Sequence, residues 1–176
     1  ILKSLKSNKI KLLWLLGYDE IIPKNNSESL IIYQGHHGDI GANSADLILP
    51  GSAYTEKNAT YINTEGRVQR TYASVPPPGN AKEDWKIIRA FSEYINKVLP
   101  YNNISQLRAR FEEINKNFNI ENSLIKSDTN DIGDTSVKLS SSKIEPANIN
   151  YFMTCPISRS SETMAKCTIS KSKLDM

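Results

Sequence analysis

The chain has 176 residues, a length that suits one ordinary domain with a tail or a large piece of a bigger protein. Hydrophobic residues make up 39% and charged residues 23%, which is the balance of a folded soluble protein and not of a fully disordered one. The net charge of +3 is well short of the basic excess of a nucleic-acid binder, so we expect no nucleic-acid partner.

Residue counts exclude several further classes. The longest apolar run, at residues 11–16, is far shorter than the roughly 20 residues of a membrane-spanning helix. Two cysteines, Cys155 and Cys167, are too few for a disulfide scaffold, an iron–sulfur cluster or a four-thiolate zinc site. We expect them to be structural or incidental thiols. Because the first residue is Ile1, we expect the sequence to begin inside a longer reading frame or after processing.

Three short apolar runs in the first third of the chain predict strands. They span residues 10–16, 30–33 and 46–51, and each is followed by a glycine-containing segment. Continuous apolar runs of this length are typical of parallel strands that are covered on both faces. We therefore expect one edge of an α/β sheet, with an open edge at residues 11–16 that needs a partner strand.

The next segments predict a hairpin and two helices. Alternating residues at 60–63 and 67–72 flank a turn at 64–66, which is the pattern of a β-hairpin. Apolar spacings of three and four predict a helix over 81–98 with Lys82, Glu83 and Lys86 on its outer face. Its buried stripe consists of Trp85, Ile88, Phe91, Ser92 and Ile95.

A second helix is expected over 105–117, with Asn103 as its cap and a stripe formed by Leu107, Phe111 and Ile114. Residues 119–150 show no period and predict an irregular, exposed linker. After it we expect an ordered tail in which Ser158 caps a short helix that ends at Cys167.

Gly35, Gly38 and Gly41 lie in a glycine-rich segment directly after the second strand, where a phosphate-binding loop would lie. The spacing fits neither the dinucleotide fingerprint nor the P-loop, and no helix clearly begins after it, so a tight turn is favoured over a phosphate site. His36 and His37 would point in opposite directions on an extended segment. A metal site that adds Glu56 or Asp39 is therefore less favoured than ordinary turn histidines.

A row of polar residues in the predicted hairpin is the last candidate site. Asn63, Glu65, Arg67 and Gln69 alternate, so a regular ribbon places them on one face, where they could hold a polar ligand or pair with one another. Pairing within the ribbon is the favoured interpretation. Gly66 between them is expected to adopt a positive φ.

Several strings resemble one protein family in order and spacing. They are YQGHHGDIG at 33–41, ADLILPG at 45–51, AYTEK at 53–57, TYINTEGRVQ at 60–69 and EDWKIIR, which includes Trp85, at 83–89. They resemble the C-terminal part of the largest iron–sulfur subunit of respiratory complex I, in the molybdopterin oxidoreductase superfamily. The tail string SRSSETMAKC at 158–167 is similar to the mitochondrial members in particular.

The resemblance implies an incomplete molybdopterin-oxidoreductase-like α/β domain over residues 1–118, a linker over 119–148 and a tail over 149–176. It implies a structural and assembly role in the peripheral arm that carries electrons from NADH to ubiquinone, on the matrix side of the mitochondrial inner membrane. No catalytic, cofactor-binding or metal-binding residue is expected here. The 2Fe-2S and 4Fe-4S clusters would belong to an N-terminal part of the subunit that this sequence lacks.

The implied partners are that N-terminal part and other peripheral-arm subunits, with no direct membrane span. Two other functions stay open at this point. The chain could be a fragment of a catalytic molybdopterin oxidoreductase, because the superfamily shares several of the strings. It could also be a stand-alone nucleotide-binding module that uses the segment from Gly35 to Gly41.

Overall fold

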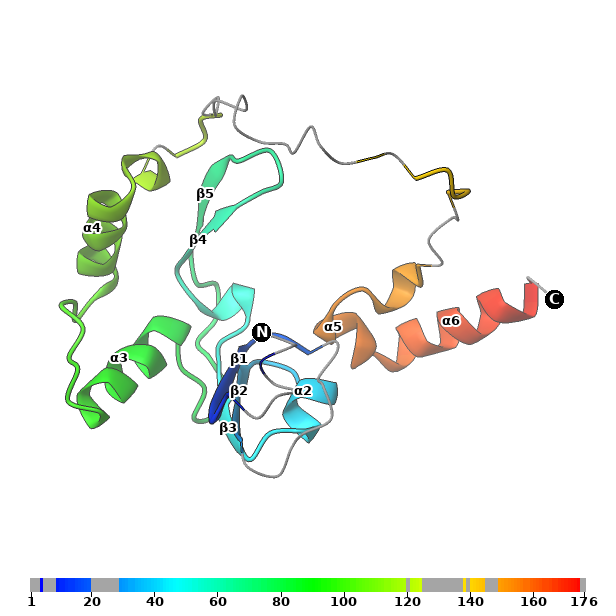
Figure 1. Ribbon diagram of the computed structural model, residues 1–176, viewed down its shortest axis with the longest axis horizontal. Coiled ribbons are helices and arrows are strands. Elements are labelled where there is room, and N and C mark those ends of the chain that lie inside the picture. The colour runs from blue at the N-terminus through cyan, green and yellow to red at the C-terminus, as the bar shows by residue number, and fades with distance from the viewer. Residues whose placement is uncertain are drawn as a thin grey trace.

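The computed structural model describes residues 4, 9–19, 29–119, 121–124, 138, 140–144 and 149–174. Figure 1 shows a small sheet at the centre, a hairpin and two helices on one side of it, and the C-terminal helices on the other side. The mixed α/β class expected from the sequence is confirmed. None of the helices in the described ranges is long and apolar enough to cross a membrane.

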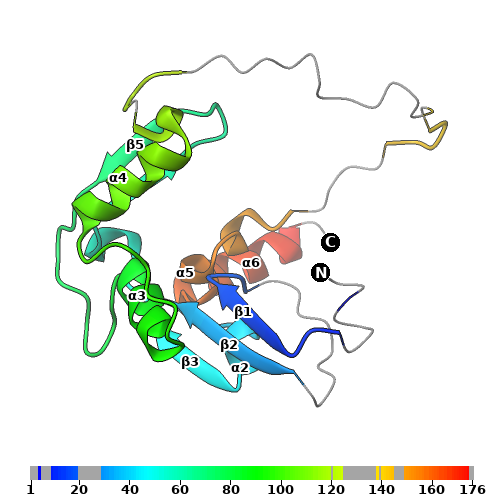
Figure 2. The same ribbon diagram turned by 60° about the vertical axis from the view of Figure 1, so that its left-hand side comes forward.

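The central sheet has three strands in the order in which they occur along the chain. Strands β1 (Leu12–Leu16), β2 (Leu30–Gly35) and β3 (Leu47–Pro50) are parallel, as predicted, and Figure 2 shows the three arrows running side by side. Trp14 lies opposite Ile32, and Ile32 lies opposite Leu47. The parallel register brings the carboxyl ends of all three strands to the same edge.

Only the middle strand is buried on both faces. Ile31, Ile32 and Tyr33 are 2–3% exposed, whereas Leu12, Leu16, Leu47 and Ile48 on the outer strands are 45–59% exposed. The expectation of three fully covered strands was therefore wrong for β1 and β3, because among the described residues little packs over these side chains on the faces of the outer strands. Within the described ranges, no strand other than β2 pairs with β1, which agrees with the open edge predicted at residues 11–16.

Different groups cover the two faces of the sheet. Leu15, Ile31 and Tyr33 form the core on the face that packs against Ala42 of the short helix α2 (Ile40–Asn43) and against Ala45. On the other face, the ring of Trp14 meets Phe91 of helix α3 (Asp84–Tyr94) edge-to-face, with ring centroids 4.8 Å apart. Figure 1 shows α2 and α3 on opposite sides of the strands.

Helix α3 is shorter than the predicted span of 81–98. At its start, the Lys82 N–H bonds to the Pro50 carbonyl and the Lys82 carbonyl accepts from Ser52, so this backbone extends the sheet and cannot join the helix. At its end, Asn96 adopts a φ of 55°, and the Lys97 N–H bonds back to the Ser92 carbonyl. A left-handed residue with this bond closes a helix, and asparagine tolerates the conformation.

The predicted hairpin and second helix are both present. Strands β4 (Ala59–Ile62) and β5 (Val68–Thr71) pair antiparallel, and helix α4 (Ile104–Ile114) packs beside β4, with the Asn103 side chain accepting from the Gln106 N–H at 2.9 Å. A 3₁₀ helix, η2 (Lys116–Asn119), follows α4. Phe111 and Ile114 of the expected buried stripe are 40% and 65% exposed, so that stripe is covered only in part.

The tail differs from its prediction. A 3₁₀ helix η3 (Tyr151–Met153) leads into helix α5 (Pro156–Arg159), whose cap is Cys155, and a separate helix α6 (Glu162–Leu174) then projects away from the sheet (Figure 1). Ser158 is therefore inside α5 and does not cap the long helix, whose Met164 N–H bonds to Ser161 instead. Most of the predicted linker at 119–150 lies outside the described residues.

The contrast between the inner and outer strands gives a test of the core. Replacing Ile31, which is 2% exposed, by Ala should lower the free energy of unfolding by about 2–5 kcal/mol, because it leaves a cavity in the core. The matched change at Ile48, which is 52% exposed, should cost less than about 0.5 kcal/mol. Denaturant unfolding of both variants measures the difference, and equal losses would contradict the burial pattern.

Candidate functional site at the carboxyl edge of the sheet

The residues that follow the three parallel strands meet at one edge. Open α/β sheets bind ligands outside this edge, so it is the first place to look for a functional site. The segments after β1, β2 and β3 bring Asp19, His36, His37, Asp39 and Ser52 to this edge. Two polar clusters form here, one toward α3 and the other toward α2 and the tail.

The first cluster is built on the carboxylate of Asp84 at the start of α3. Gln34, which is 1% exposed at the end of β2, donates from Nε2 to Asp84 Oδ1 at 2.9 Å. Lys57, which follows the 3₁₀ helix η1 (Tyr54–Glu56), donates from Nζ to Asp84 Oδ2 at 2.5 Å. One carboxylate therefore joins the central strand, the segment before the hairpin and helix α3.

Glu83 forms a second junction beside Asp84. Its Oε2 accepts from Trp85 Nε1 at 3.0 Å and pairs with Lys86 Nζ at 2.8 Å, and its Oε1 accepts from the Asn58 N–H at 3.3 Å. Its side chain is 12% exposed, so the prediction that placed Glu83 on an outer face was wrong. Glu83 precedes the helix, and its side chain turns back toward Asn58. Its direction therefore cannot be predicted from the periodicity of the helix.

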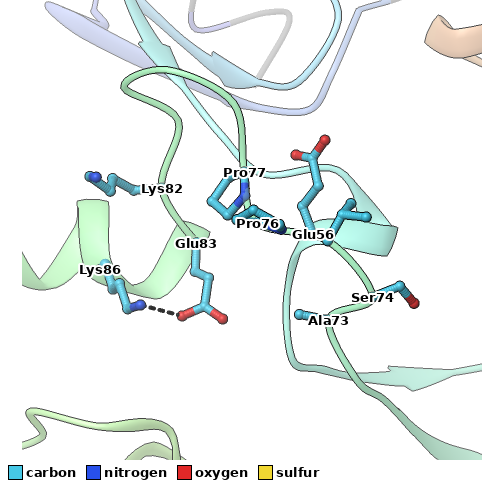
Figure 3. Close-up of a pocket in the computed structure, with 9 residues that line it drawn as sticks. Glu56, Ala73, Ser74, Pro76, Pro77, Lys82, Glu83 and Lys86 are labelled. Atoms are coloured by element: carbon cyan, nitrogen blue, oxygen red, sulfur yellow. Dashed lines mark ion pairs between the residues drawn. The ribbon is translucent and has the colours of Figure 1, made fainter.

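A groove of about 470 Å³ lies next to Glu83. Figure 3 shows the Lys86–Glu83 pair at one wall and Pro76 and Pro77 near the centre, with Glu56 on the far side. Burial alone would raise the pKa of Glu83, but hydrogen bonds from Lys86, the Asn58 N–H and Trp85 lower it on balance. The carboxylate is therefore held ionised, and the Lys86 charge is neutralised by the protein itself.

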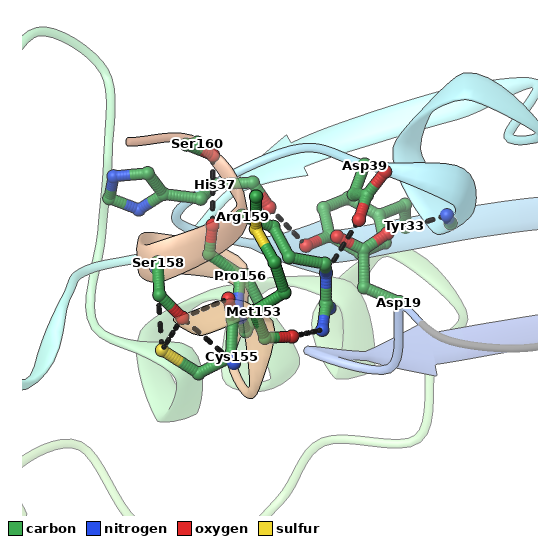
Figure 4. Close-up of polar contacts among 11 residues, drawn as sticks. Asp19, Tyr33, His37, Asp39, Met153, Cys155, Pro156, Ser158, Arg159 and Ser160 are labelled. Carbon is green, nitrogen blue, oxygen red and sulfur yellow. Dashed lines mark hydrogen bonds and ion pairs between the residues drawn. The ribbon is translucent and has the colours of Figure 1, made fainter. Parts of the chain in front are cut away.

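The second cluster joins the tail to the sheet. Arg159 of α5 donates from Nε to Asp39 Oδ2 at 2.6 Å, across 120 residues of sequence, and a longer bond of 3.5 Å runs from its Nη1 to the Met153 carbonyl. The side chains are 21% and 31% exposed. Figure 4 shows the Arg159 guanidinium between Asp39 on one side and the Met153 carbonyl on the other. This ion pair fixes α5 against the carboxyl edge.

Asp19 and Tyr33 form the floor of this second cluster. The Tyr33 hydroxyl donates to the His37 carbonyl at 2.5 Å, and Asp19, which is 2% exposed, accepts from the Gly41 N–H at 2.5 Å. A β-carbon on Gly41 would lie 2.6 Å from the Tyr18 carbonyl oxygen, so glycine is required there by close approach. Burial and the nearby Asp19 carboxylate raise the pKa of Tyr33, which keeps its hydroxyl protonated as a donor.

The two histidines do not lie as the sequence predicted. His36 Nδ1 and His37 Nδ1 are 2.7 Å apart and the two rings lie edge-on to each other, because the loop turns here and is not extended. Of the two proposed extra metal ligands, Glu56 lines the same groove as both rings, whereas Asp39 is paired with Arg159. Within the described ranges, no three His, Cys, Asp or Glu side chains gather as a metal site would require.

The segment from Gly35 to Gly41 ends in a helix that the sequence did not predict. Helix α2 begins at Ile40, but it has only four residues, and Asp39 lies at its N-cap. The helix is too short for a strong dipole, and the side chains of Asp39 and Arg159 are already paired with each other. The geometry therefore gives the phosphate-loop interpretation no support.

The polar residues of the hairpin turn bond to one another and to a nearby backbone carbonyl. Asn63 Oδ1 accepts from the backbone N–H groups of Glu65 and Arg67, both at 3.0 Å, and Gly66 adopts a φ of +86°. Arg67 pairs with Glu65 at 3.5 Å and donates to the Asn122 carbonyl at 2.9 Å. The Glu65 side chain is 61% exposed, so this pair contributes little to stability, while Gln69 lies exposed on β5.

Both cysteines are free thiols, and Cys155 is exposed. Hydrogen bonding from the Ser158 hydroxyl and backbone N–H lowers the pKa of Cys155, which is the cap of α5. Sequence reasoning missed Asp19, Asp84 and Arg159 as site residues. The family-like strings contained the last two, but spacing alone could not show that each meets a partner from a distant segment.

The fold and the carboxyl edge of the sheet define part of a mixed α/β domain. Ion pairs between the chain's own side chains hold this polar edge together. The model of the molybdopterin oxidoreductase family matches residues 1–94, more than half of the sequence, and the chain belongs to this family. A second family model, which describes the C-terminal region of the G subunit of NADH-ubiquinone oxidoreductase, matches residues 119–167.

Curated relatives agree with the second match. The NADH-ubiquinone oxidoreductase 75 kDa subunit of Reclinomonas americana is 51% identical over 168 residues, which cover 89% of this chain and 23% of the relative. The mitochondrial 78 kDa subunit of Candida albicans is 48% identical over 92% of this chain and 24% of its own length. The G subunit of the NADH-quinone oxidoreductase of Rickettsia conorii is 42% identical over 97% and 25%. The chain therefore spans about a quarter of the length of these relatives.

The Arg159–Asp39 pair gives a second prediction. Replacing Arg159 by Ala leaves a half-buried carboxylate without its partner and should release η3 and α5 from the sheet, raising their amide hydrogen exchange by roughly tenfold, the equivalent of about 1.4 kcal/mol. Replacing Lys166, whose pair with Glu162 is largely exposed, should change exchange little. Similar exchange in the two variants would rule out a docking role for Arg159.

A third prediction concerns the pH dependence of stability. The folded pKa of Glu83 lies below its ordinary value of 4.5, so the stabilisation is fully present above pH 4.5 and is lost as the pH falls through the folded pKa. The free energy of unfolding of Glu83→Gln should therefore be lower than that of the parent above pH 4.5, and the difference should shrink as the pH falls below that value. Glu113→Gln, at an exposed pair, serves as the control. A gap that stays constant with pH would contradict this account.

Proposed function

We propose that the chain is a structural and assembly segment of the large subunit of NADH:ubiquinone oxidoreductase. In this role it forms part of the peripheral arm that carries electrons from NADH to ubiquinone. Support comes from relatives at 42–51% identity that carry this enzyme's name and match most of the chain. The observation on which the structural role rests is the Arg159–Asp39 pair, which ties residues matched by the NADH-ubiquinone oxidoreductase model to residues matched by the molybdopterin oxidoreductase model.

A molybdopterin cofactor is what the family implies, and the residues present do not fit it. A pterin with its phosphate needs free donors at the carboxyl edge. The donors of Gln34 and Lys57 are taken by Asp84, and Arg159 is taken by Asp39. Three buried atoms at this edge lack a partner among the described residues: Asp19 Oδ2, Gln34 Oε1 and Ser52 Oγ. The first two are acceptors, which do not bind phosphate, and the Ser52 hydroxyl is a single neutral donor. Because these donors are already paired, we also disfavour the two alternative functions, a fragment of a catalytic molybdopterin oxidoreductase and a nucleotide-binding module.

In this proposal the residues of the sequence motifs have structural roles. In this proposal none of them is catalytic or binds a cofactor or metal; they shape turns and close contacts. They are Gly35, Gly38, Gly41, Asn63, Glu65, Gly66, Arg67, Gln69 and Trp85. Iron–sulfur clusters would be bound by the remainder of a longer subunit, because Cys155 and Cys167 cannot supply the four thiolates that a cluster requires.

The proposed setting follows from the relatives. The partners are the remaining part of the large subunit and other peripheral-arm subunits, on the matrix side of the mitochondrial inner membrane, with no nucleic acid. The relative from Candida albicans is named as mitochondrial, which supports this location. Within the chain we propose a domain part at 1–118, a linker at 119–148 and a tail at 149–176.

The test of this proposal separates assembly from catalysis. In cells that make the protein, Arg159→Ala should lower the amount of assembled complex, because the tail loses its anchor on the sheet. NADH:ubiquinone turnover per assembled particle should stay near the parent value, and Lys166→Ala should leave both quantities unchanged. Full assembly with lost turnover would assign the edge a catalytic role, and failure of the chain to purify with complex I subunits would overturn the proposal as a whole.

A further inference from the structure

The only two histidines of the sequence, His36 and His37, are adjacent in the loop that follows strand β2. Their Nδ1 atoms are 2.7 Å apart, and the centroids of the two rings are 5.0 Å apart. Neither side chain is buried, since His36 is exposed and His37 is half-buried. Figure 4 shows the His37 ring on the side away from Tyr33 and Asp39. An ion from solution can therefore reach this pair of rings.

Backbone contacts hold the main chain on both sides of the histidine pair. The Gly35 carbonyl accepts from the Gly51 N–H at 2.9 Å, and the His37 carbonyl accepts from the Tyr33 hydroxyl at 2.5 Å. These bonds tie the turn to strand β2 and to the residue after strand β3, so the two rings are brought together before any ligand arrives. Preorganisation of this kind lowers the entropic cost of binding.

The spacing of the two nitrogens is close to that of two ligands on one metal ion. Two imidazole nitrogens bound at about 2.0–2.1 Å lie roughly 2.9–3.4 Å apart, from right-angled to tetrahedral bonding. The observed 2.7 Å is slightly shorter, so a small rotation of the rings admits the ion. The hydrogen that one Nδ1 now donates to the other can be carried by Nε2 of the same ring. Imidazole nitrogen suits Cu²⁺ and Zn²⁺, whereas Mg²⁺ prefers oxygen.

The charges around His36 also favour a cation. The charged side chains that act on its ring are Lys57, Asp84 and Glu56, which are one cation and two carboxylates. Lys57 is itself paired with Asp84 at 2.5 Å, and Glu56 lines the same groove of about 380 Å³ as both histidines. Loss of hydration and the neighbouring His37 ring lower the pKa of His36, which keeps it in the neutral form that binds metals.

We propose that the Nδ1 atoms of His36 and His37 together chelate one divalent transition-metal ion, Cu²⁺ or Zn²⁺, with water in its remaining positions. Two protein ligands are fewer than the three or four that hold a permanent zinc centre, so the ion exchanges with the solution. Cu²⁺ binds more tightly than Zn²⁺, as nitrogen ligands generally dictate. The site does not depend on the proposed function, and it assigns a ligand to a loop that has only a structural role in that proposal.

A titration of the full chain with Cu²⁺ alone tests the site. Both cysteines are first replaced, as Cys155→Ser and Cys167→Ser, because free thiols bind and reduce Cu²⁺. Isothermal titration calorimetry should then show one Cu²⁺ ion per chain, and Mg²⁺ should give no binding heat. The electron paramagnetic resonance spectrum of the bound Cu²⁺ should show splitting by two nitrogen nuclei, which a single imidazole cannot give.

His36→Gln and His37→Gln in the same background are the matched variants, because each leaves one imidazole in place. If the two rings form one chelate, each substitution should weaken Cu²⁺ binding by roughly tenfold or more and remove the two-nitrogen splitting. The metal-free variants should unfold at the same denaturant concentration as the parent, which separates lost ligands from lost fold. Two ions per chain, with one retained at unchanged affinity in each variant, would show separate histidines and overturn the proposal. Absence of Cu²⁺ binding, or binding that persists without both histidines, would overturn it as well.

Discussion

The buried end of strand β2 sets the constraint on which the rest of the structure depends. Gln34 is almost completely enclosed, and its amide needs a partner at the edge where a ligand would otherwise bind. Asp84 supplies that partner and in turn needs a cation, which Lys57 provides. Because the three residues come from different segments, the bond from one buried amide nitrogen fixes the central strand, the approach to the hairpin and helix α3 relative to one another.

The same logic repeats on the other face of the sheet. Asp39 follows the second strand and is neutralised by Arg159 from the far end of the chain. In the same segment after β2, the Tyr33 hydroxyl bonds to the His37 carbonyl and Asp19 accepts from the Gly41 N–H. Lys57 and Arg159 at the edge are thus each matched by a carboxylate of the same chain. An edge that is internally matched in this way holds segments together and has few free donors for a phosphate-bearing cofactor, which is why a structural role fits a member of a cofactor-binding family.

Local sequence patterns predicted the elements well and their ends less well. Apolar runs predicted the three strands, and alternation around Gly66 predicted the hairpin, because these signals depend on near neighbours. The start of α3 was placed too early because Lys82 is held by backbone bonds to β3, and the tail helix was placed wrongly because Pro156 and Cys155 begin a separate short helix. The close approach of the His36 and His37 rings depends on how the loop turns, and pairs such as Arg159 with Asp39 are set by tertiary contacts that spacing does not encode.

A density map of the native assembly, at a resolution that shows side chains, is the most direct test of the central claim. We predict that Lys57 contacts Asp84 and Arg159 contacts Asp39 in that map, with the protein's own side chains filling the carboxyl edge of the sheet. Density for a pterin or nucleotide bound at this edge, with Lys57 or Arg159 turned toward it, would contradict the structural account.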